Sequence, residues 1–152
     1  MQLTRHDMSI IVPIEFGKLS YYESQVFEYV NNKYLGSCTN THGYIVKIIN
    51  VNILNNIISR SQPTVLFQVQ ITVLLFNPSV GDIVKCNVVK LFSEGIWTEI
   101  KVETITVCLA IPKNNIKGMR DIQIGENLDV KISNVHFDGK INKYIGTLDY
   151  GL

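Results

Sequence analysis

Charged side chains are scarce in this chain of 152 residues. Aspartate, glutamate, lysine and arginine together make up 18% of it, and the formal net charge is +1. A protein dedicated to binding DNA usually carries a strongly basic domain, because phosphate contacts dominate its affinity. The charge balance therefore excludes that class, and we predict that any contact with nucleic acid is weak, local or shared with partner proteins.

Motifs for metal binding and catalysis are also lacking. Cys38, Cys86 and Cys108 are too widely spaced for a C-x-x-C pair or a zinc signature, so we expect buried thiols that fill core space. The histidines are scattered, and the sequence has no phosphate-binding glycine loop, no dinucleotide fingerprint, no H-E-x-x-H and no nucleophile elbow. We predict a protein without catalytic residues, without a metal and without a cofactor.

Long hydrophobic runs are absent as well. No apolar stretch reaches the ~18 residues that a membrane helix needs, and the N-terminus lacks the layout of a signal peptide. We therefore expect a protein with no membrane contact that stays inside the cell, or inside a particle assembled there. Hydrophobic residues still make up 46% of the chain, which is enough to bury a core and excludes disorder.

The first half of the chain predicts a sheet with one helix. Apolar residues recur every three or four positions over Ser20–Leu35, Ser20 and Glu23 have the spacing of a capping box, and Gly36 suits a left-handed cap at the end of the helix. Pro13 should lie at the edge or end of its strand. The strands expected in this half are Ser9–Ile14, Tyr44–Val51 and Thr64–Phe76.

The second half predicts a small barrel. The turn residues of Asn77–Gly81 mark a hinge between two separately packed halves, and we place the domains at residues 1–78 and 79–152. Five short strands at regular spacing match the strand count of an OB-fold, and Asp138-Gly139 suits a two-residue hairpin turn. The expected strands are Asp82–Leu91, Ile96–Lys101, Thr104–Ile111, Asn127–Phe137 and Lys140–Asp149.

Four stretches of the chain carry a resemblance to a known family. They are Gly36–Val46, Val73–Val84, Gly95–Ile100 and Tyr144–Leu152. In this order they resemble the seventh subunit of eukaryotic RNA polymerase II and the larger stalk subunit of archaeal RNA polymerase, over nearly the whole chain. The resemblance implies an α+β, mostly β fold: a truncated ribonucleoprotein-like domain in residues 1–78, followed by a five-stranded OB-fold barrel in residues 79–152.

The resemblance also implies a function. Members of this family are non-catalytic stalk subunits of multisubunit DNA-directed RNA polymerases, which dock the polymerase core near the clamp, pair with a small helical partner subunit, act in transcription initiation and contact single-stranded nascent RNA. The compact length and the isoleucine- and asparagine-rich composition resemble a copy in a large DNA virus. A viral copy would lie in the virion or host cytoplasm, and a cellular copy in the nucleus.

Two departures from the family pattern leave rival interpretations open. Glu94 precedes Gly95 where barrels of the wider type often carry an aromatic residue, and the loop from Pro112 to Glu126 is short. Glu94 puts strong RNA stacking in doubt, and the loop is shorter than expected of a nuclear family member. The main rival is a free-standing OB-fold RNA-binding factor of translation or RNA decay, which would bind RNA tightly by itself. A second rival is the equivalent stalk subunit of RNA polymerase I or III.

Trp97 is the most informative candidate for RNA contact. Side chains alternate between the faces of a strand, so if Ile96, Thr98 and Ile100 fill the barrel, Trp97 points outward. An outward indole can stack a base, or it can pack against the docking domain or a partner. The predicted RNA-binding residues are Lys85, Lys90, Phe92, Trp97, Lys101, His136, Lys140 and Lys143, the lysines having ordinary solvated side chains as the alternative.

The segment Asn52–Gln62 is the candidate for polymerase docking. It is asparagine-rich but contains two aliphatic pairs, and exposed apolar patches usually mark interfaces. A locally folded surface loop is the alternative. The predicted docking residues are Ile53, Leu54, Ile57, Ile58 and, on the following strand, Phe67, although the alternation of that strand also places Phe67 in the core.

Overall fold

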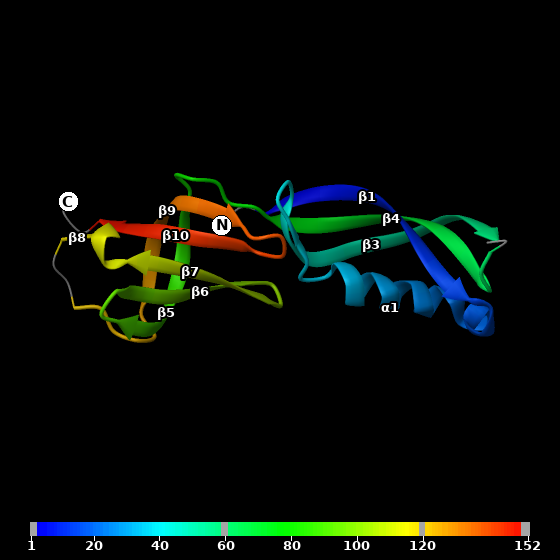
Figure 1. Ribbon diagram of the computed structural model, residues 1–152, viewed down its shortest axis with the longest axis horizontal. Coiled ribbons are helices and arrows are strands. Elements are labelled where there is room, and N and C mark those ends of the chain that lie inside the picture. The colour runs from blue at the N-terminus through cyan, green and yellow to red at the C-terminus, as the bar shows by residue number, and fades with distance from the viewer. Residues whose placement is uncertain (1–2, 59–60, 119–120, 150–152) are drawn as a thin grey trace.

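The computed structural model describes residues 3–58, 61–118 and 121–149, and within them the protein is mostly β with one α-helix. Figure 1 shows an elongated molecule in which the two halves of the chain lie end to end. The first half contains β1 (Thr4–Glu15), the 3-10 helix η1 (Phe16–Tyr21), α1 (Tyr22–Tyr34), β2 (Cys38–Thr39), β3 (Gly43–Ile58) and β4 (Thr64–Phe76). The second half contains β5 (Ile83–Phe92), β6 (Gly95–Val102), β7 (Ile105–Pro112), the 3-10 helix η2 (Lys113–Asn115), β8 (Ile116–Lys117), β9 (Asn127–Phe137) and β10 (Asn142–Asp149). No helix in the described residues is long and apolar enough to cross a membrane.

The first half is an antiparallel sheet in the order β1-β4-β3-β2, with α1 covering one face (Figure 1). Alternate side chains of β4, from Val65 to Leu75, point toward α1 and are buried. Val26 and Val30 of α1 complete this core. Pro13 lies on β1, which pairs only with β4 in the described sheet, so its missing N–H is tolerated at an edge as predicted.

The predicted capping box is wrong. The chain forms η1 before α1 begins at Tyr22, and the N-cap residue Tyr21 makes no side-chain cap hydrogen bond. Ser20 therefore lies inside a helical turn, whereas an N-cap residue needs non-helical backbone angles. The left-handed backbone of Gly36, with a φ of 83°, is confirmed.

Residues 52–58 of the Asn52–Gln62 segment are part of a strand, because β3 continues to Ile58 and pairs with β4 along its length. Three register shifts interrupt this pairing. They bend the strand and let polar and apolar residues alternate irregularly, which explains why a regular strand pattern ended at Val51 in the sequence. Residues 59 and 60 lie outside the described residues.

The second half is a closed five-stranded barrel, consistent with an OB-fold. Its strand order is β7-β6-β5-β9-β10, and the parallel pairing of Tyr144 with Leu109 and of Ile145 with Ala110 closes the cylinder. The predicted strands match the observed ones to within a few residues at each end. The prediction of a two-residue hairpin turn is wrong, because residues 138–141 form the loop between β9 and β10. The Asp138 carboxylate accepts hydrogen bonds from the N–H groups of Lys140 and Ile141, each at 2.9 Å.

The junction between the halves is packed, although each half has an apolar cluster of its own. There are two apolar clusters, but the cluster inside the barrel includes Tyr44, Val46 and Phe76 from the ends of β3 and β4. The turn after β4 is also held by the barrel, since the Gly81 N–H donates to the Ile132 carbonyl at 2.8 Å. The ends of β3 and β4 therefore pack into one end of the barrel and extend its core.

Candidate nucleic-acid interface

An apolar groove lies on the outer surface of the barrel beside the β5–β6 hairpin. Its volume is about 360 Å³. The residues that line it are Phe92, Glu94, Gly95, Ile96, Trp97, Ala110, Ile111 and Pro112. Phe92 and Trp97 are 51% and 40% exposed, so two aromatic rings at this groove are accessible to a ligand. We call it the aromatic groove.

The outward orientation of Trp97 is confirmed. Ile96, Thr98 and Ile100 are buried inside the barrel, and alternation along β6 places Trp97 on the other face. Thr98 is a polar residue in this core, and its hydroxyl donates to the Leu109 carbonyl at 2.8 Å. The polar group inside the barrel therefore has its hydrogen-bond partner, and the Trp97 side chain lies on the outer surface.

Lys90 joins the two aromatic residues. A register shift between Val88 and Lys90 changes the alternation of β5, and Lys90 then lies opposite Trp97 on β6. The Lys90 ammonium lies 5.4 Å from the centroid of the Phe92 ring, a cation–π distance. Glu94 adds a carboxylate to the lining, which disfavours a phosphate in the groove. The arrangement suits an unpaired base with its phosphate on the Lys90 side.

Lys85 and Lys101 belong to a second groove, not to the aromatic one. This groove of about 400 Å³ is also lined by Cys86, Asn87, Glu99 and Asn127. Lys85 lies opposite Asp129 across the β5–β9 pairing. Because Glu99 and Asp129 accompany the two lysines, this second groove is of mixed charge and offers less attraction for phosphates than a row of lysines would.

The structure does not bring His136, Lys140 and Lys143 to the aromatic groove. They belong to the β9–β10 hairpin, which points toward the first half, whereas the β5–β6 turn lies at the other end of the barrel (Figure 1). His136 pairs with Lys143, whose ammonium lies 3.7 Å from the Asp138 carboxylate. The N–H groups of Ile141 and Lys140 hold the pKa of Asp138 below its usual value, so this carboxylate is charged and offsets the lysine.

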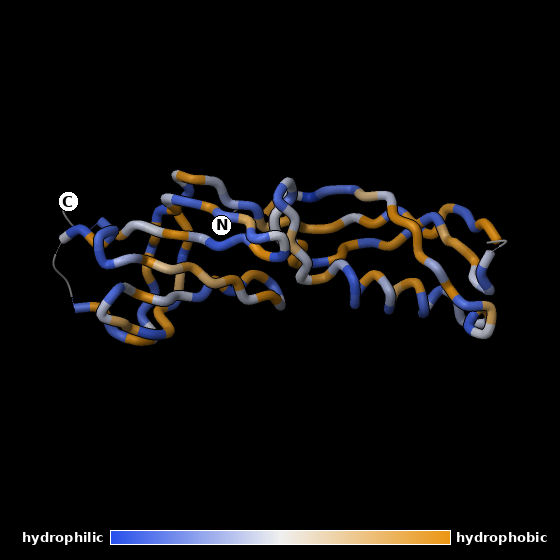
Figure 2. Tube along the Cα trace, viewed as in Figure 1, coloured by the Kyte–Doolittle hydropathy of each residue, from blue (hydrophilic) through white to orange (hydrophobic). Residues whose placement is uncertain are grey.

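The far end of the first half carries an exposed apolar patch. Leu54, Ile57 and Ile58 are 51%, 61% and 66% exposed at the end of β3, and Phe16 is exposed where β1 ends. The Phe16 N–H donates to the Pro63 carbonyl, which brings η1 beside the start of β4. Figure 2 shows hydrophobic stretches of the chain at this end of the molecule, alternating with hydrophilic ones. Ile57 and Ile58 are consecutive residues of β3 and lie on opposite faces of the sheet, so these apolar side chains surround the tip. We call Phe16, Leu54, Ile57 and Ile58 together the distal tip patch.

Two of the predicted docking residues are not free for docking. The prediction of Phe67 as a docking residue is wrong, because its side chain is 4% exposed and stacks on Tyr22 with ring centroids 5.2 Å apart. Ile53 is partly buried against the core of the first half. Phe16 was missed, since alternation along β1 puts even-numbered residues in the core and gave no sign that the chain turns into η1 at that point.

The cysteines are only partly as expected. Cys86 is buried, and burial raises the pKa of its thiol to about 11. Cys38 is partly buried at the junction of the two halves. The expectation of a buried thiol is wrong for Cys108, which is exposed because it lies on the outward-facing side of β7.

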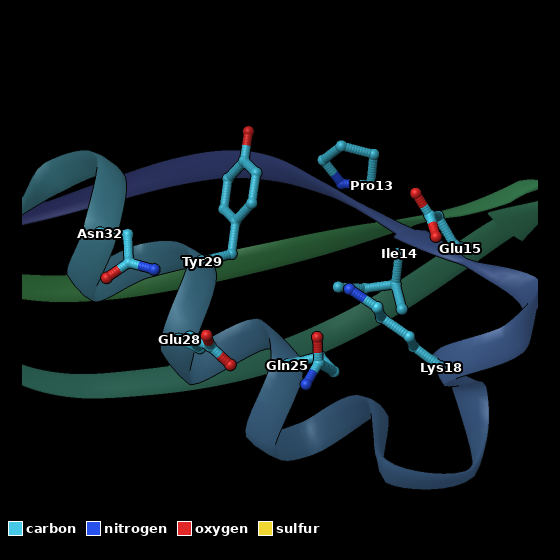
Figure 3. A pocket seen from close by; sticks show the side chains of 8 residues that line it. All are labelled: Pro13, Ile14, Glu15, Lys18, Gln25, Glu28, Tyr29 and Asn32. Atoms are coloured by element: carbon cyan, nitrogen blue, oxygen red, sulfur yellow. The ribbon is translucent and has the colours of Figure 1, made fainter.

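A small cavity of about 210 Å³ lies between β1 and α1 and was not anticipated from the sequence. Figure 3 shows that β1, η1 and α1 all contribute to it, with Pro13, Ile14, Glu15, Lys18, Gln25, Glu28, Tyr29 and Asn32 in its lining. Its polar groups are mixed in charge. Within the part of the chain that the structure describes, no cluster of three or more histidine, cysteine, aspartate or glutamate residues could hold a metal ion.

No protein-family model and no curated protein sequence matches this chain. The features that bear on function are therefore surfaces of the molecule itself. The aromatic groove, with Lys90 beside it, suits an unpaired base. The distal tip patch suits a protein partner that covers the end of the sheet, because exposed aliphatic and aromatic side chains lie at this end.

Proposed function

We propose that this chain is a non-catalytic stalk subunit of a multisubunit DNA-directed RNA polymerase. The first half docks the polymerase core near the clamp as a truncated ribonucleoprotein-like domain, and the OB-fold barrel contacts nascent RNA. One observation carries the proposal: the distal tip patch and the barrel with its aromatic groove lie in opposite halves of one elongated molecule (Figure 1). A polymerase and its transcript can therefore be contacted at the same time.

The distal tip patch supports docking to a large protein partner. It consists of four apolar side chains that are each about half exposed or more. Burial of apolar surface favours association by ~25 cal/mol for each Å². An aromatic residue among aliphatic ones is typical of the centre of an interface. The barrel has no part in this patch, so docking leaves the aromatic groove open.

The aromatic groove supports weak RNA contact. Stacking contributes ~1–3 kcal/mol for each base, and two aromatic rings hold one or two bases. The resulting binding energy of roughly 1–6 kcal/mol corresponds to a Kd between about 0.2 M and tens of micromolar. Such contact is effective only when a partner holds the RNA nearby, as a polymerase would. This favours a subunit over the free-standing RNA-binding factor.

Affinity purification tests the proposal. The tagged chain is purified from cells of its source, or from infected cells if a large DNA virus encodes it, and the bound proteins are identified by mass spectrometry. We expect the two largest polymerase subunits and a small helical partner subunit. Recovery of RNA or ribosomal proteins without polymerase subunits would instead support the free-standing factor, and the identity of the large subunits separates polymerases I, II and III.

A further inference from the structure

Asn142 is a buried polar residue at the boundary between the two halves. It begins β10 and is 4% exposed. Its backbone carbonyl accepts a hydrogen bond from the Tyr44 hydroxyl at 3.0 Å, although the two residues are 98 positions apart. Its side-chain amide donates to the Tyr144 hydroxyl at 3.3 Å. Asn142 therefore joins a tyrosine of the first half to a tyrosine of the barrel.

Aromatic rings surround these hydrogen bonds. The Tyr144 ring lies 6.4 Å from the Tyr44 ring and 6.2 Å from the Phe76 ring, edge-on to the latter. All three residues are buried in the barrel cluster, although Tyr44 and Phe76 come from the ends of β3 and β4. Aromatic pairs in this geometry stabilise one another beyond the burial of their surface. Separating the halves would expose all three rings to water.

The connecting turn allows little freedom. The Gly81 N–H donates to the Ile132 carbonyl and the Ile132 N–H donates to the Asp82 carbonyl, each at 2.8 Å, so the turn is fastened to β9. At Gly43, the backbone is so close to the Phe76 carbonyl that an added Cβ would lie 2.4 Å from its oxygen. The turn is therefore held against the barrel by β9, and the ends of β3 and β4 that reach the barrel cluster are in close backbone contact with each other.

We propose that the Tyr44–Asn142 hydrogen bond locks the two halves into one rigid body with a single orientation. Apolar contact alone is not directional, whereas a hydroxyl that must reach one buried carbonyl is satisfied in one orientation only. Rotation of the halves would leave both groups unpaired in the interior, which is unfavourable. The lock fixes the distance between the distal tip patch and the aromatic groove, whatever partner each of them binds, and it does not depend on the polymerase assignment.

Hydrogen exchange of the full chain tests the lock. In Tyr44→Phe, which removes the hydroxyl that donates to the Asn142 backbone carbonyl, we expect the junction amides of Gly81 and Ile132 to exchange about tenfold to a hundredfold faster, the factor that corresponds to leaving a buried partner unpaired. The amides of the central strand β4 should keep their wild-type rates, because the core of the first half is unchanged. Tyr21→Phe removes the same oxygen atom from an exposed tyrosine of the first half and should change none of these rates.

Rotational tumbling gives a second measure. Backbone ¹⁵N relaxation should report one common rotational diffusion tensor for both halves of the wild-type chain, and separate tensors for Tyr44→Phe. Independent tumbling of the halves in the wild type overturns the proposal. So does a folded Tyr44→Phe variant with wild-type junction exchange. Tyr44→Phe keeps the ring and removes a single oxygen, so it removes the hydrogen bond without leaving a large cavity in the core.

Discussion

Replacing Trp97 by alanine should weaken RNA binding by a factor that can be estimated from the structure. The chain contains a single tryptophan. Trp97 lines the aromatic groove, is 40% exposed and does not belong to the barrel interior. If one base stacks on the indole, its loss removes ~1–3 kcal/mol, or about a 5- to 150-fold rise in Kd.

The assay uses a short fluorescein-labelled single-stranded RNA and anisotropy at low salt. Trp97 fluorescence provides an independent signal in the wild type, because a stacked base quenches the indole directly. Phe27→Ala is the matched control, since Phe27 is an exposed aromatic residue of α1, outside the barrel. Thermal unfolding of each variant checks that the barrel is intact.

The reasoning is refuted by either of two results. One is a Trp97→Ala variant that binds the RNA as tightly as the wild type. The other is an indole whose emission does not change when the RNA is saturating, because that would place the RNA elsewhere on the molecule. A loss of binding in Phe27→Ala equal to that in Trp97→Ala would show non-specific contact with exposed rings.

Three further predictions concern stability, measured by urea unfolding. Gly43→Ala should destabilise the chain by at least ~2 kcal/mol, because Gly43 has a φ of 71° and no space for a Cβ; an unchanged midpoint would contradict the close contact between the ends of β3 and β4. Phe67→Ala should cost about 3–5 kcal/mol as a buried ring, whereas Ile57→Ala at the exposed tip should stay within ~0.5 kcal/mol; equal effects would contradict the burial of Phe67. Burial raises the pKa of Tyr144 to about 12 and that of Cys86 to about 11 in the folded chain, so the unfolded chain loses these protons first and stability should fall as pH rises from about 9 through 12. The stability of the Tyr144→Phe variant should fall less steeply above pH 10 than that of the wild type. A curve parallel to the wild-type curve would show that Tyr144 does not contribute to this pH dependence.

The sequence predicted the barrel better than the first half because barrel strands alternate regularly. Ile96, Thr98 and Ile100 fill the interior, and this period of two located β6 and the orientation of Trp97 correctly. Parallel closure through Tyr144 and Leu109 was not readable from the pattern, because alternation fixes which face a residue occupies but not which strand lies beside it.

The errors in the first half have local physical causes. The register shifts in β3 broke the alternation, so the strand was predicted to end at Val51 although it continues to Ile58. The capping box failed because the motif is short and tertiary packing decided otherwise: Leu19 of η1 packs on the core, which keeps the chain helical through Ser20.

The candidate site was predicted in part. Lys90, Phe92 and Trp97 were named and do lie together, but Lys85 and Lys101 line a separate groove. The register shift between Val88 and Lys90 places Lys90 opposite Trp97, and such bulges leave little trace in a single sequence. Contacts between segments far apart in the chain, such as the bond from Tyr44 to Asn142, leave none.

Polymerase capture by tip variants tests the central claim most directly. Ile57→Asp combined with Ile58→Asp places two charges in the distal tip patch, and Asn50→Asp combined with Asn52→Asp places two on exposed positions of the same strand nearer the junction. We predict that the wild type and the asparagine variant retain the largest polymerase subunits from a cell extract, and that the isoleucine variant, folded as judged by circular dichroism, loses them. Equal capture by both variants, or capture by none of the three proteins, would contradict the account.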